Sequence, residues 1–498
     1  MAIGGLDIGS TSAKLTVLDR NGGLLYSMQA EYPVSRQAGE HEMNVEDILS
    51  AVGQLVRGTA AAVPELTALG VTSFGESFVL LDEEDRPLLP VMLYTDSRGE
   101  EEAALLQARP GVEEIAERVG TLPHSMYSLP KLMWIKRNRP DIYGRTKRAC
   151  LIGEYIVYWL TGNRLLDYSL ATRTMGFDIR RKEWDTEAFR AAGINPALFA
   201  DPVPTGSSAG RILPSLAEEL GCPGELQVVL CGHDQITAAL GAGALGAGMT
   251  TDGGGTVQCL TPVFSEIPAG GFLQRSHYAV IPFPGEDNYC CYAFSFTGGS
   301  LIRWFTDGFG ERFRLEAERD GITVYDALER QMTDTPTGIL TLPHFAGAAT
   351  PYMDTGSQGA FVGLGLSHSP ADLYRSIMEG ITYEMRLNRD VLARGGIHIG
   401  ALNATGGCAK SRLWLQMKAD ILGIPVTRMG VDDAGTVGSV MLTGVATGAY
   451  ESMEAACDIL VRKLETFFPR EEMRRQYDAV YRRYRGLYEA VRPLFMDV

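Results

Sequence analysis

A five-residue pattern that occurs twice constrains the fold of this chain most strongly. Residues 7–11 (DIGST) and 252–256 (DGGGT) both read D-x-G-x-T. The two copies lie 252 − 7 = 245 positions apart, close to half of the 498-residue chain. Self-similarity at a long offset indicates a repeated structural unit. We therefore expect two similar α/β lobes, with residues 1–246 in the first and residues 247–498 in the second.

Short β-rich runs and a helical period around the first copy favour an α/β architecture. A 3.6-residue apolar period follows Asn44 and predicts a helix that Asn44 caps. The expected strands are Ile3–Ile8, Leu15–Leu18, Leu24–Tyr32, Val71–Phe74 and Val79–Leu81, with a further β-rich run at Val257–Leu260 after the second copy.

Composition excludes several classes of protein. The net charge of 45 − 61 = −16 and the pI near 5.0 argue against nucleic acid or an anionic membrane as a partner. Two long uncharged runs, 235–251 and 434–450, hold four glycines each and are too short to span a bilayer. The N-terminus lacks a signal-peptide pattern, and the eight cysteines form no C-x-x-C pair. We expect a cytoplasmic protein with reduced thiols.

The two D-x-G-x-T turns suit the binding of phosphate. Glycine-rich turns can point several backbone N–H groups and a Thr hydroxyl at phosphate oxygens. An Asp beside such a turn can hold Mg²⁺ directly or through water. Two turns, one in each lobe, would bind a triphosphate across a cleft. Because the protein and the triphosphate are both negatively charged, a metal ion would be needed to offset the repulsion. The alternative is that both are ordinary hairpin turns.

Asp234 is the candidate for acid–base chemistry. It follows a strand predicted at Gln227–Leu230 and begins a helix. A carboxylate at such a junction is placed to face a cleft and accept a proton from a hydroxyl. The alternative is a structural N-cap, because Asp is also a good capping residue.

Two other glycine-rich segments imitate well-known fingerprints. Residues 241–246 (GAGALG) match G-x-G-x-x-G, but the segment before them reads as a helix, so close helix packing explains the glycines better. Residues 406–411 (GGCAKS) approach a P-loop, but Ala409 stands where that motif requires glycine before the lysine. Neither a Rossmann nor a Walker A site is expected.

Taken together, several segments resemble the FGGY carbohydrate-kinase family, which includes xylulose, gluconate and glycerol kinases. Residues 126–138 (MYSLPKLMWIKRN) fit its first signature, and 359–364 with 372–379 fit the second. Residues 404–411 (ATGGCAKS) are similar to its adenosine segment. The resemblance covers nearly the whole chain. It implies two actin- and hexokinase-like (ribonuclease-H-like) lobes that close on Mg-ATP and on a small sugar or polyol in the cleft between them.

The resemblance also implies roles for individual residues. Asp234 matches the general base, and Asp7, together with Asp234, would hold Mg²⁺, Asp7 directly or through water. The ATP-binding set comprises phosphate contacts at Gly9, Ser10, Thr11, Gly255, Thr256, Gly298 and Gly299, and the adenosine segment with Gly406, Gly407 and Ser411.

The sugar-binding segments depart from familiar members of the family. Residues 75–79 (GESFV) replace the G-Q-M-H-G of xylulose kinases, whereas 94–98 (YTDSR) are closer to their W-N-D-x-R. The expected substrate-binding residues are Glu76, Ser77, Tyr94, Asp96 and Asp234, although Glu76 could instead pair with a cation. A ketopentose such as xylulose is the expected substrate.

Other substrates in the same family remain alternatives, namely gluconate or another aldonate, a hexulose, erythritol and glycerol. A sugar- or nucleotide-sensing relative without catalysis is the non-enzyme alternative. The presence of Asp7, Thr11, Asp234 and Thr256 favours the kinase. Family members often dimerise, so a homodimer is expected, although nothing in the sequence marks an interface.

Overall fold

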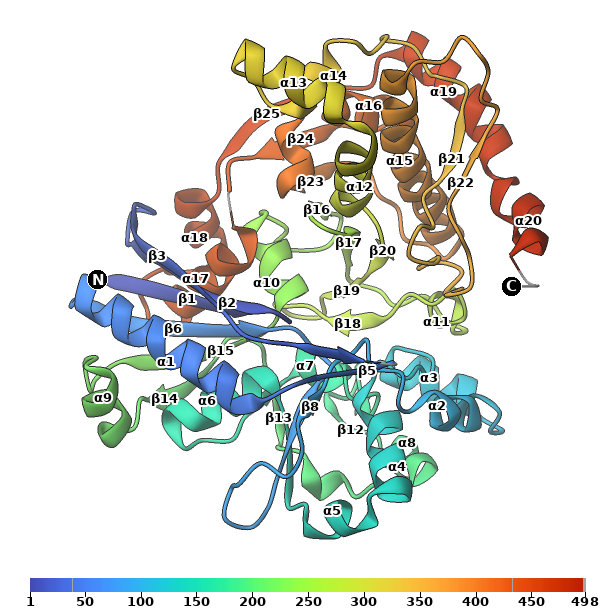
Figure 1. The fold of residues 1–498 in the computed structure, drawn as a ribbon. Helices are drawn as coiled ribbons and strands as arrows, with labels where there is room; N and C mark the ends of the chain where they lie inside the picture. The colour runs from blue at the N-terminus through green and yellow to red at the C-terminus, as the bar shows by residue number, and fades with distance from the viewer. Residues whose placement is uncertain (38, 432, 496–498) are drawn as a thin grey trace.

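The computed structural model describes residues 1–37, 39–431 and 433–495. Two large sheets form the centres of two lobes, one below the other in Figure 1. The first sheet has six strands in the order β14 (Ser207–Arg211), β15 (Gln227–His233), β6 (Leu66–Ser73), β1 (Ala2–Ile8), β2 (Ser12–Asp19) and β3 (Leu24–Glu31). The second has eight, in the order β18 (Val280–Pro282), β19 (Tyr289–Cys291), β17 (Gln258–Phe264), β16 (Thr250–Gly254), β23 (Leu402–Thr405), β24 (Val426–Met429) and β25 (Lys463–Phe467), with β20 (Ala293–Ser295) paired to β17.

The two sheets repeat one topology. In the first, β1 pairs antiparallel with β2 and parallel with β6, which pairs parallel with β15. In the second, β16 pairs antiparallel with β17 and parallel with β23, which pairs parallel with β24. Each D-x-G-x-T copy begins in the first strand of its unit and turns into the second. The two similar α/β lobes that the sequence repeat predicted are therefore confirmed.

Alternation along β1 explains how one strand serves both core and site. Leu6 and Ile8 belong to the hydrophobic core that contains α1 (Val45–Ala62) and α6 (Ile152–Thr161). Ile3 belongs to a different core with α17 (Ala434–Ala446), because successive side chains of a strand point to opposite faces. Asp7 shares the second face, so the same alternation that buries Ile3 directs Asp7 toward the start of α17.

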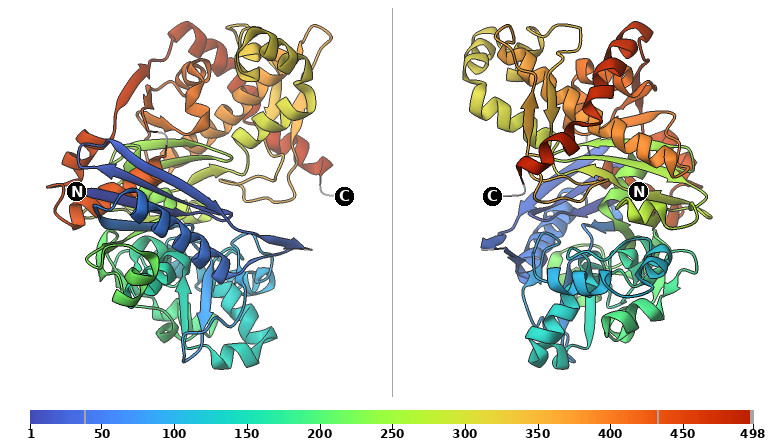
Figure 2. Two further views of the ribbon diagram at one scale, coloured as in Figure 1. Left: turned by 60° about the vertical axis from the view of Figure 1, so that its left-hand side comes forward. Right: turned by 90° about the vertical axis from the view of Figure 1, so that its right-hand side faces the viewer.

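Two helices from the second half of the chain pack on the first sheet. Val440 and Met441 of α17 and Leu460 of α18 (Met453–Leu460) share a core with Ile3. Figure 1 shows both helices beside β1 and β2, and Figure 2 shows the same arrangement from other directions. The domain boundary near residue 246 stays a prediction. α17 and α18 lie after that boundary in the sequence, yet they pack on the sheet of the first lobe.

The crossing of α17 with α10 (Asp234–Gly241) is exceptionally close. A Cβ on Gly241 would lie 1.9 Å from the Ala434 carbonyl oxygen, and one on Gly438 would lie 1.9 Å from that of Thr237. Real Cβ atoms never approach that closely, so both positions require glycine. Close helix packing is therefore confirmed for Gly241, the last residue of α10, whereas Gly243 and Gly246 follow the helix and an added Cβ there would meet no atom closer than 3.5 Å.

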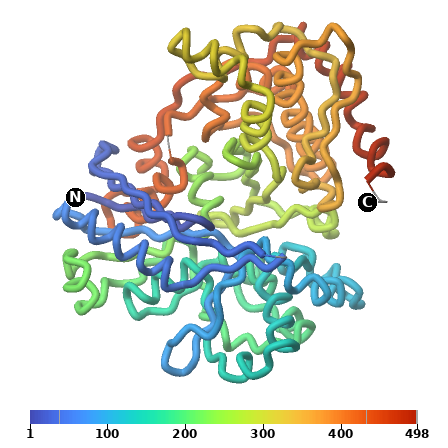
Figure 3. Tube along the Cα trace, viewed as in Figure 1, coloured from blue at the N-terminus to red at the C-terminus, as the bar shows by residue number. Residues whose placement is uncertain are grey.

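The second lobe is covered by the remaining long helices. α15 (Pro370–Arg394), α16 (Arg412–Leu422) and α19 (Glu471–Tyr484) share one core, in which Tyr477, Tyr481 and Tyr484 of α19 are buried. The chain trace in Figure 3 places the two ends on opposite sides of the molecule. α12 (Gly299–Phe309) begins at a glycine turn described below.

Smaller elements complete the fold. The short strands are β4 (Ser35–Gln37), β5 (Glu40–Met43), β7 (Phe78–Leu81), β8 (Val91–Met92), β9 (Arg148–Leu151), β10 (Leu166–Asp167), β11 (Phe177–Asp178), β12 (Glu183–Trp184), β13 (Pro202–Val203), β21 (Leu340–Leu342) and β22 (Ala360–Val362). The other helices are α2 (Glu100–Gln107), α3 (Val112–Val119), α4 (Ser128–Asn138), α5 (Pro140–Arg145), α7 (Tyr168–Thr172), α8 (Thr186–Ala192), α9 (Pro214–Leu220), α11 (Phe272–Arg275), α13 (Glu311–Asp320), α14 (Val324–Glu329) and α20 (Leu487–Val491), with 3₁₀ turns η1 (Pro196–Leu198), η2 (Gly407–Lys410) and η3 (Arg492–Leu494).

Three local expectations can be compared with these elements. The predicted strands and the helix after Asn44 are present, but the Asn44 side chain makes no capping hydrogen bond. All eight cysteines are free thiols, as expected. Within the described ranges, no helix has both the length and the apolar character that a membrane crossing requires.

Candidate active site

Asp7 lies at the end of β1, against the first turn of α17. Its Oδ2 lies 2.8 Å from where a Cβ on Gly435 would stand, so glycine lets the helix approach the carboxyl group. Gly9 N donates to Ser12 O at 2.9 Å, which closes the turn that Ser10 and Thr11 also form. Burial, and then the charges of Asp234 and Asp433, raise the pKa of Asp7 well above its usual value, and Lys14 opposes them.

Asp433 is a functional candidate that sequence reasoning missed. It caps α17 by accepting a hydrogen bond from Thr436 N at 3.2 Å, and Lys14 Nζ lies 2.7 Å from its Oδ2. The sequence does not indicate that Asp433 lies near Asp7, because only the packing of α17 on β1 brings the two residues together. The helix start therefore adds a second carboxylate near the first D-x-G-x-T turn.

Asp234 is the first residue of α10, immediately after β15. His233 occupies the N-cap, so the alternative that Asp234 serves as a structural cap is wrong. The Asp234 side chain is 28% exposed. Burial of the carboxyl group and the charge of Glu76 raise its pKa to about 7, against hydrogen bonds from Gln235 and the charge of Arg173. A carboxyl group with this pKa can exchange protons near neutral pH.

His233 joins the two lobes beside Asp234. Its Nδ1 lies 2.9 Å from the hydroxyl of Tyr292, which belongs to the second lobe, and the two rings stack with centroids 5.5 Å apart. Its Nε2 lies 3.5 Å from Asp234 Oδ1. Burial and the nearby Arg173 hold the pKa of His233 well below its usual value, so the ring is neutral.

Glu76 is committed to an ion pair. Arg173 Nε donates to Glu76 Oε1 at 2.6 Å, and an Nη of the same guanidinium donates to the same oxygen. Both side chains are about 95% buried. The alternative that Glu76 pairs with a cation is therefore confirmed, and its partner lies 97 residues away in the sequence.

Asp96 is not placed as a free acceptor for sugar hydroxyls, and this part of the predicted site is corrected. Its Oδ1 accepts from the backbone N and the Nε of Arg98, both at 2.9 Å. Its Oδ2 accepts from His41 N at 2.8 Å and from an Nη of Arg98 at 2.6 Å. These four donors use the lone pairs of the carboxylate. Asp96 thus organises its own loop.

Ser77 and Tyr94 remain near the predicted sugar site. Ser77 is fully buried and its Oγ has no hydrogen-bond partner among the described atoms. Burial, Glu76 and Asp234 raise the pKa of Tyr94, which also interacts with Ser10. Tyr94 therefore lies near both Ser10 of the first D-x-G-x-T turn and Asp234.

Asp252, the counterpart of Asp7 in the second lobe, is locked in the interior. Lys418 Nζ lies 2.6 Å from its Oδ2, and Gln258 donates to its Oδ1. Asp252 and Lys418 are 0% and 1% exposed. The two Asp residues of the repeat therefore differ, because only Asp7 lies beside other carboxylates that a cation could neutralise.

The second lobe brings together the two glycine segments that contain the predicted phosphate contacts Gly255, Thr256, Gly298 and Gly299. Gly299 N donates to Gly255 O at 2.9 Å, and Ser300 N donates to Thr256 O at 3.0 Å. A Cβ on Gly298 would lie 2.8 Å from the Val257 carbonyl carbon. These contacts place the start of α12 beside the second D-x-G-x-T turn, where helix N–H groups favour an anion.

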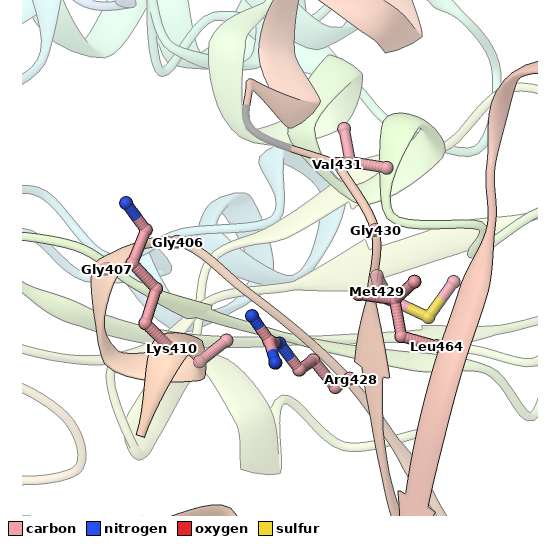
Figure 4. A pocket seen from close by; sticks show the side chains of 9 residues that line it. Gly406, Gly407, Lys410, Arg428, Met429, Gly430, Val431 and Leu464 are labelled. Carbon is pink, nitrogen blue, oxygen red and sulfur yellow. The ribbon is translucent and has the colours of Figure 1, made fainter. Parts of the chain in front are cut away.

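A cavity of ≈160 Å³ opens next to these turns (Figure 4). Gly406 and Gly407 line it, and Gly406 has φ 82° and lies against the Gly254 carbonyl. Lys410 from the η2 turn and Arg428 from β24 add two cationic side chains that sequence reasoning missed. No motif in the sequence pointed to Arg428, because β24 lies outside the glycine segment at 404–411.

Ser411 does not line this cavity, and its predicted contact with the nucleotide stays a prediction. Its hydroxyl accepts from Trp414 N at 3.0 Å, which caps α16, and it lies 2.6 Å from Glu329 Oε1 as a donor. Both hydrogen-bonding functions of the hydroxyl are thus used within the second lobe.

The carboxylates around Asp7 could hold Mg²⁺ only together with other ligands, because the protein side chains alone do not form a complete metal site. No cluster of three or more His, Cys, Asp or Glu side chains in the described part of the chain is arranged to hold a metal ion. Mg²⁺ commonly binds one or two carboxylates together with water and substrate phosphates. The like charges around Asp7 would be relieved by such a cation.

The repeated topology and the paired glycine turns define the actin- and hexokinase-like class of two-lobed proteins. The profile of the N-terminal domain of the FGGY family of carbohydrate kinases matches residues 2–241, and that of the C-terminal domain matches residues 272–447. The chain belongs to the FGGY family of carbohydrate kinases. It is therefore a carbohydrate kinase, from a family that uses ATP.

Individual relatives carry different names. A xylulose kinase from Lactococcus lactis is 26% identical over 97% of this chain and 96% of its own. A gluconokinase from Bacillus subtilis is 29% identical over 92% of this chain and 90% of its own. The structure of a ligand-bound xylulose kinase from Lactobacillus acidophilus matches with a TM-score of 0.90 over 99% of both chains, at 21% identity, which shows a shared fold.

Proposed function

We propose that this carbohydrate kinase transfers the γ-phosphoryl group of ATP to a hydroxyl of a small sugar or sugar derivative, with Asp234 as the general base. The observation that carries the proposal is the setting of Asp234. It stands at the junction of the lobes, and burial and Glu76 raise its pKa to about 7. A base whose pKa lies near the working pH is effective in accepting a hydroxyl proton.

In the proposed reaction, the sugar hydroxyl donates its proton to the Asp234 carboxylate as its oxygen attacks the γ-phosphorus, and ADP departs. Phosphoryl transfer depends mainly on positioning and charge stabilisation. The turns at Gly9 and Gly255 and the start of α12 would face the phosphates, with N–H groups other than those of Gly9, Gly255 and Gly299, which donate to the carbonyl oxygens of Ser12, Val257 and Gly255. Mg²⁺ bound at Asp7, with Asp234 close by, would neutralise phosphate charge. The glycine segment at Gly406 would line the nucleoside site.

The substrate class has two candidates. A ketopentose such as xylulose remains the prediction from the resemblance of residues 94–98 to xylulose kinases, although Asp96 no longer supports it directly. An aldonate is the second candidate, because a gluconokinase is among the relatives, 29% identical over 92% of this chain. The other sugars and polyols of the family, and a non-catalytic sensor, are outcomes that the experiment below can return.

The test is an ADP-release assay with Asp234→Asn and Asp234→Ala against a panel of ketoses, aldonates and polyols. Both variants should lower kcat by ~10²–10⁴ and leave the thermal midpoint unchanged or higher. Asp201→Asn, an exposed carboxylate of the same lobe, is the matched control and should behave like the parent. Turnover like that of the parent in Asp234→Ala would refute the assignment. Sugar binding without any ADP release in the parent protein would favour the sensor.

Two further predictions accompany this proposal. We expect the protein in the cytoplasm and as a homodimer. Fractionation of cells and light scattering after size-exclusion chromatography test them separately, and neither result affects the assignment of the base.

A further inference from the structure

The C-terminal arm, residues 484–492, is fastened to one loop of the second lobe, residues 343–357. The loop connects β21 to β22, and α20 of the arm lies beside β21 (Figure 1). Tyr488 of α20 donates its hydroxyl proton to Asp354 Oδ2 at 2.6 Å, and Arg492 Nε donates to the same oxygen at 3.3 Å. The middle of the loop is therefore held by two donors of the arm.

A second set of contacts fastens the start and the end of the loop to the same arm. The hydroxyl of Tyr484 donates to Glu384 Oε1 at 2.6 Å, and His344 Nε2 lies 3.3 Å from that oxygen. His344 Nδ1 lies 2.8 Å from Ser357 Oγ. Glu384 of α15 thus connects the arm to both ends of the loop through one histidine.

The loop is closed by its own backbone. Ala348 N donates to Asp354 O at 2.8 Å. The ring of Tyr352, inside this closed segment, packs on the ring of Tyr488 with centroids 4.0 Å apart. Coupling between distant points is carried by such chains of hydrogen bonds and packed side chains. A shift of Asp354 is therefore transmitted to Thr350, which lies between Ala348 and Asp354 in the loop.

At two other points the loop holds the segment that leads into α12. Phe294 N donates to Thr350 Oγ1 at 2.8 Å, and Thr350 N donates to Phe294 O at 3.2 Å. The hydroxyl of Thr297 donates to Pro343 O at 2.5 Å. Residues 298–299, two of the predicted phosphate contacts, follow directly in the sequence.

A continuous set of contacts therefore runs from Tyr488 through the 343–357 loop to the start of α12. All of these contacts are made within the second lobe, so they do not depend on how the lobes meet. The N–H groups at the start of a helix bind phosphate through charge-assisted hydrogen bonds. Such bonds weaken as their distance and angle depart from the optimum, so a displaced helix start binds phosphate less tightly.

We propose that Tyr488 is a positioning residue for the phosphate-binding turn at residues 298–299. Its hydroxyl fixes Asp354 and with it the 343–357 loop, and the loop fixes the segment that leads into α12. Tyr488 acts through this loop and not through contact with a substrate. The inference rests on the proposed kinase function and adds to it a role for the C-terminal arm in binding the nucleotide.

The first experiment compares two tyrosines that each donate to a carboxylate. Tyr488→Phe removes the hydrogen bond to Asp354 and keeps the ring that packs on Tyr352. Tyr481→Phe is the matched control, because its hydroxyl donates at 2.7 Å to Asp390 Oδ2, which lies on α15 outside the loop. Both variants should lose a similar, small part of the thermal midpoint.

Only Tyr488→Phe should alter the kinetics. We expect its kcat/KM for ATP to fall about tenfold through a higher KM, because hydrogen bonds to a charged group are displaced. The KM for the acceptor, measured at saturating ATP with the panel compound that the parent phosphorylates fastest, should change less than about twofold.

Three outcomes of this experiment count against a proposal. Equal kcat/KM for ATP in the parent and in Tyr488→Phe would overturn the inference and leave the kinase function intact. A tenfold loss in both Tyr488→Phe and Tyr481→Phe would also overturn it, because the loss would then follow the general anchoring of the helices. Absence of ADP release by the parent with every compound would overturn the proposed function, and the binding measurement below would still decide the role of Tyr488.

The second experiment changes the acceptor of the hydrogen bond. Asp354→Asn keeps an oxygen that can accept from the Tyr488 hydroxyl, whereas Asp354→Ala keeps none. We expect kcat/KM for ATP to fall about tenfold in Asp354→Ala and less than about threefold in Asp354→Asn. Adding Tyr488→Phe to Asp354→Ala should cause no further loss, because both changes break the same contact. Losses that simply multiply in the double variant would contradict a shared path.

Binding of a nucleotide separates positioning from chemistry. Calorimetric titration of a non-hydrolysable ATP analogue with Mg²⁺ should give a dissociation constant about tenfold weaker in Tyr488→Phe than in the parent. Tyr481→Phe should bind the analogue as the parent does. The same dissociation constant in all three proteins would overturn the inference.

Discussion

Lys418 Nζ lies 2.6 Å from Asp252 Oδ2, with both side chains withdrawn from solvent. The pair anchors α16 to β16, directly under the glycine turn of the second lobe. Removing one partner leaves an uncompensated buried charge, which costs about 3–5 kcal/mol. We expect Lys418→Met to lower the thermal midpoint sharply, as measured by calorimetry.

The double variant Asp252→Asn/Lys418→Met is the control for that experiment, because it removes both charges at once. It should recover much of the lost thermal midpoint. A single variant as stable as the parent would show that the pair adds nothing to the fold.

Asp7→Asn should lower kcat without lowering the thermal midpoint, in contrast to Lys418→Met, which should lower the thermal midpoint. Burial and like charges raise the pKa of Asp7, so its ionised form is held at a cost in the folded state. The neutral amide should raise or preserve the thermal midpoint, while kcat with Mg-ATP falls by ~10²-fold or more because phosphate charge is less well neutralised. Full activity of Asp7→Asn at limiting Mg²⁺ would exclude a metal-linked role.

The pH dependence of kcat/KM should show an acidic limb from Asp234. Only the ionised carboxylate can accept a proton, and its pKa of about 7 means that activity falls as the pH drops below that value. Glu76→Gln removes a charge that raises this pKa and leaves Arg173, which lowers it. The limb should therefore move to lower pH in Glu76→Gln. A limb that stays in place or moves upward would contradict the coupling.

Gly438→Ala should damage the crossing of α10 and α17. Its Cβ would lie 1.9 Å from Thr237 O, and overpacking of this kind costs typically ~1–3 kcal/mol or more. Gly308→Ala, in α12 with no atom within 4 Å of the new Cβ, is the matched control and should be neutral or slightly stabilising. Chemical denaturation of the two variants measures the difference. Equal midpoints would mean that the crossing adapts.

Arg428→Met should weaken binding of the nucleotide. The residue lines the cavity beside Gly406, and a hydrogen bond to a charged group contributes ~1.5–3 kcal/mol, or roughly 10–100-fold in KM for ATP. Arg412→Met is the control, because that exposed arginine pairs with Glu465 outside the cavity. If both variants have the parent's KM, Arg428 does not contact the nucleotide.

Local patterns were sufficient to predict several strands of the first lobe and the glycine turns, because these depend on neighbours in the sequence, whereas the two lobes were predicted from a motif repeated 245 positions apart. The strand β1 contributes side chains to two cores, and this division is seen in the structure rather than in residues 2–8, which are apolar or glycine except for Asp7. The approach of Gly435 to Asp7 is different, because it depends on a helix more than 400 positions away. No period or motif in the sequence encodes that distance.

The roles of the polar residues in the candidate site could not be predicted from local sequence patterns either. Glu76 and Asp96 have residue types suited to sugar hydroxyls, yet Arg173 and Arg98 use their carboxylates. Whether a carboxylate is free depends on which cation the fold brings to it. A cavity of ≈270 Å³ between His124 and Arg173 of the first half and Tyr292 of the second was not predicted for the same reason, since its walls come from both halves of the chain.

The contact between Gly241 and Ala434, and between Gly438 and Thr237, has a mechanical consequence. Backbone meets backbone at this crossing, so no side-chain rotamer has to change if one helix tilts against the other. Resistance to such a tilt would come from the cores on either side rather than from the crossing point. At this close contact between the two halves of the chain, the two helices can therefore change their crossing angle without a rearrangement of side chains.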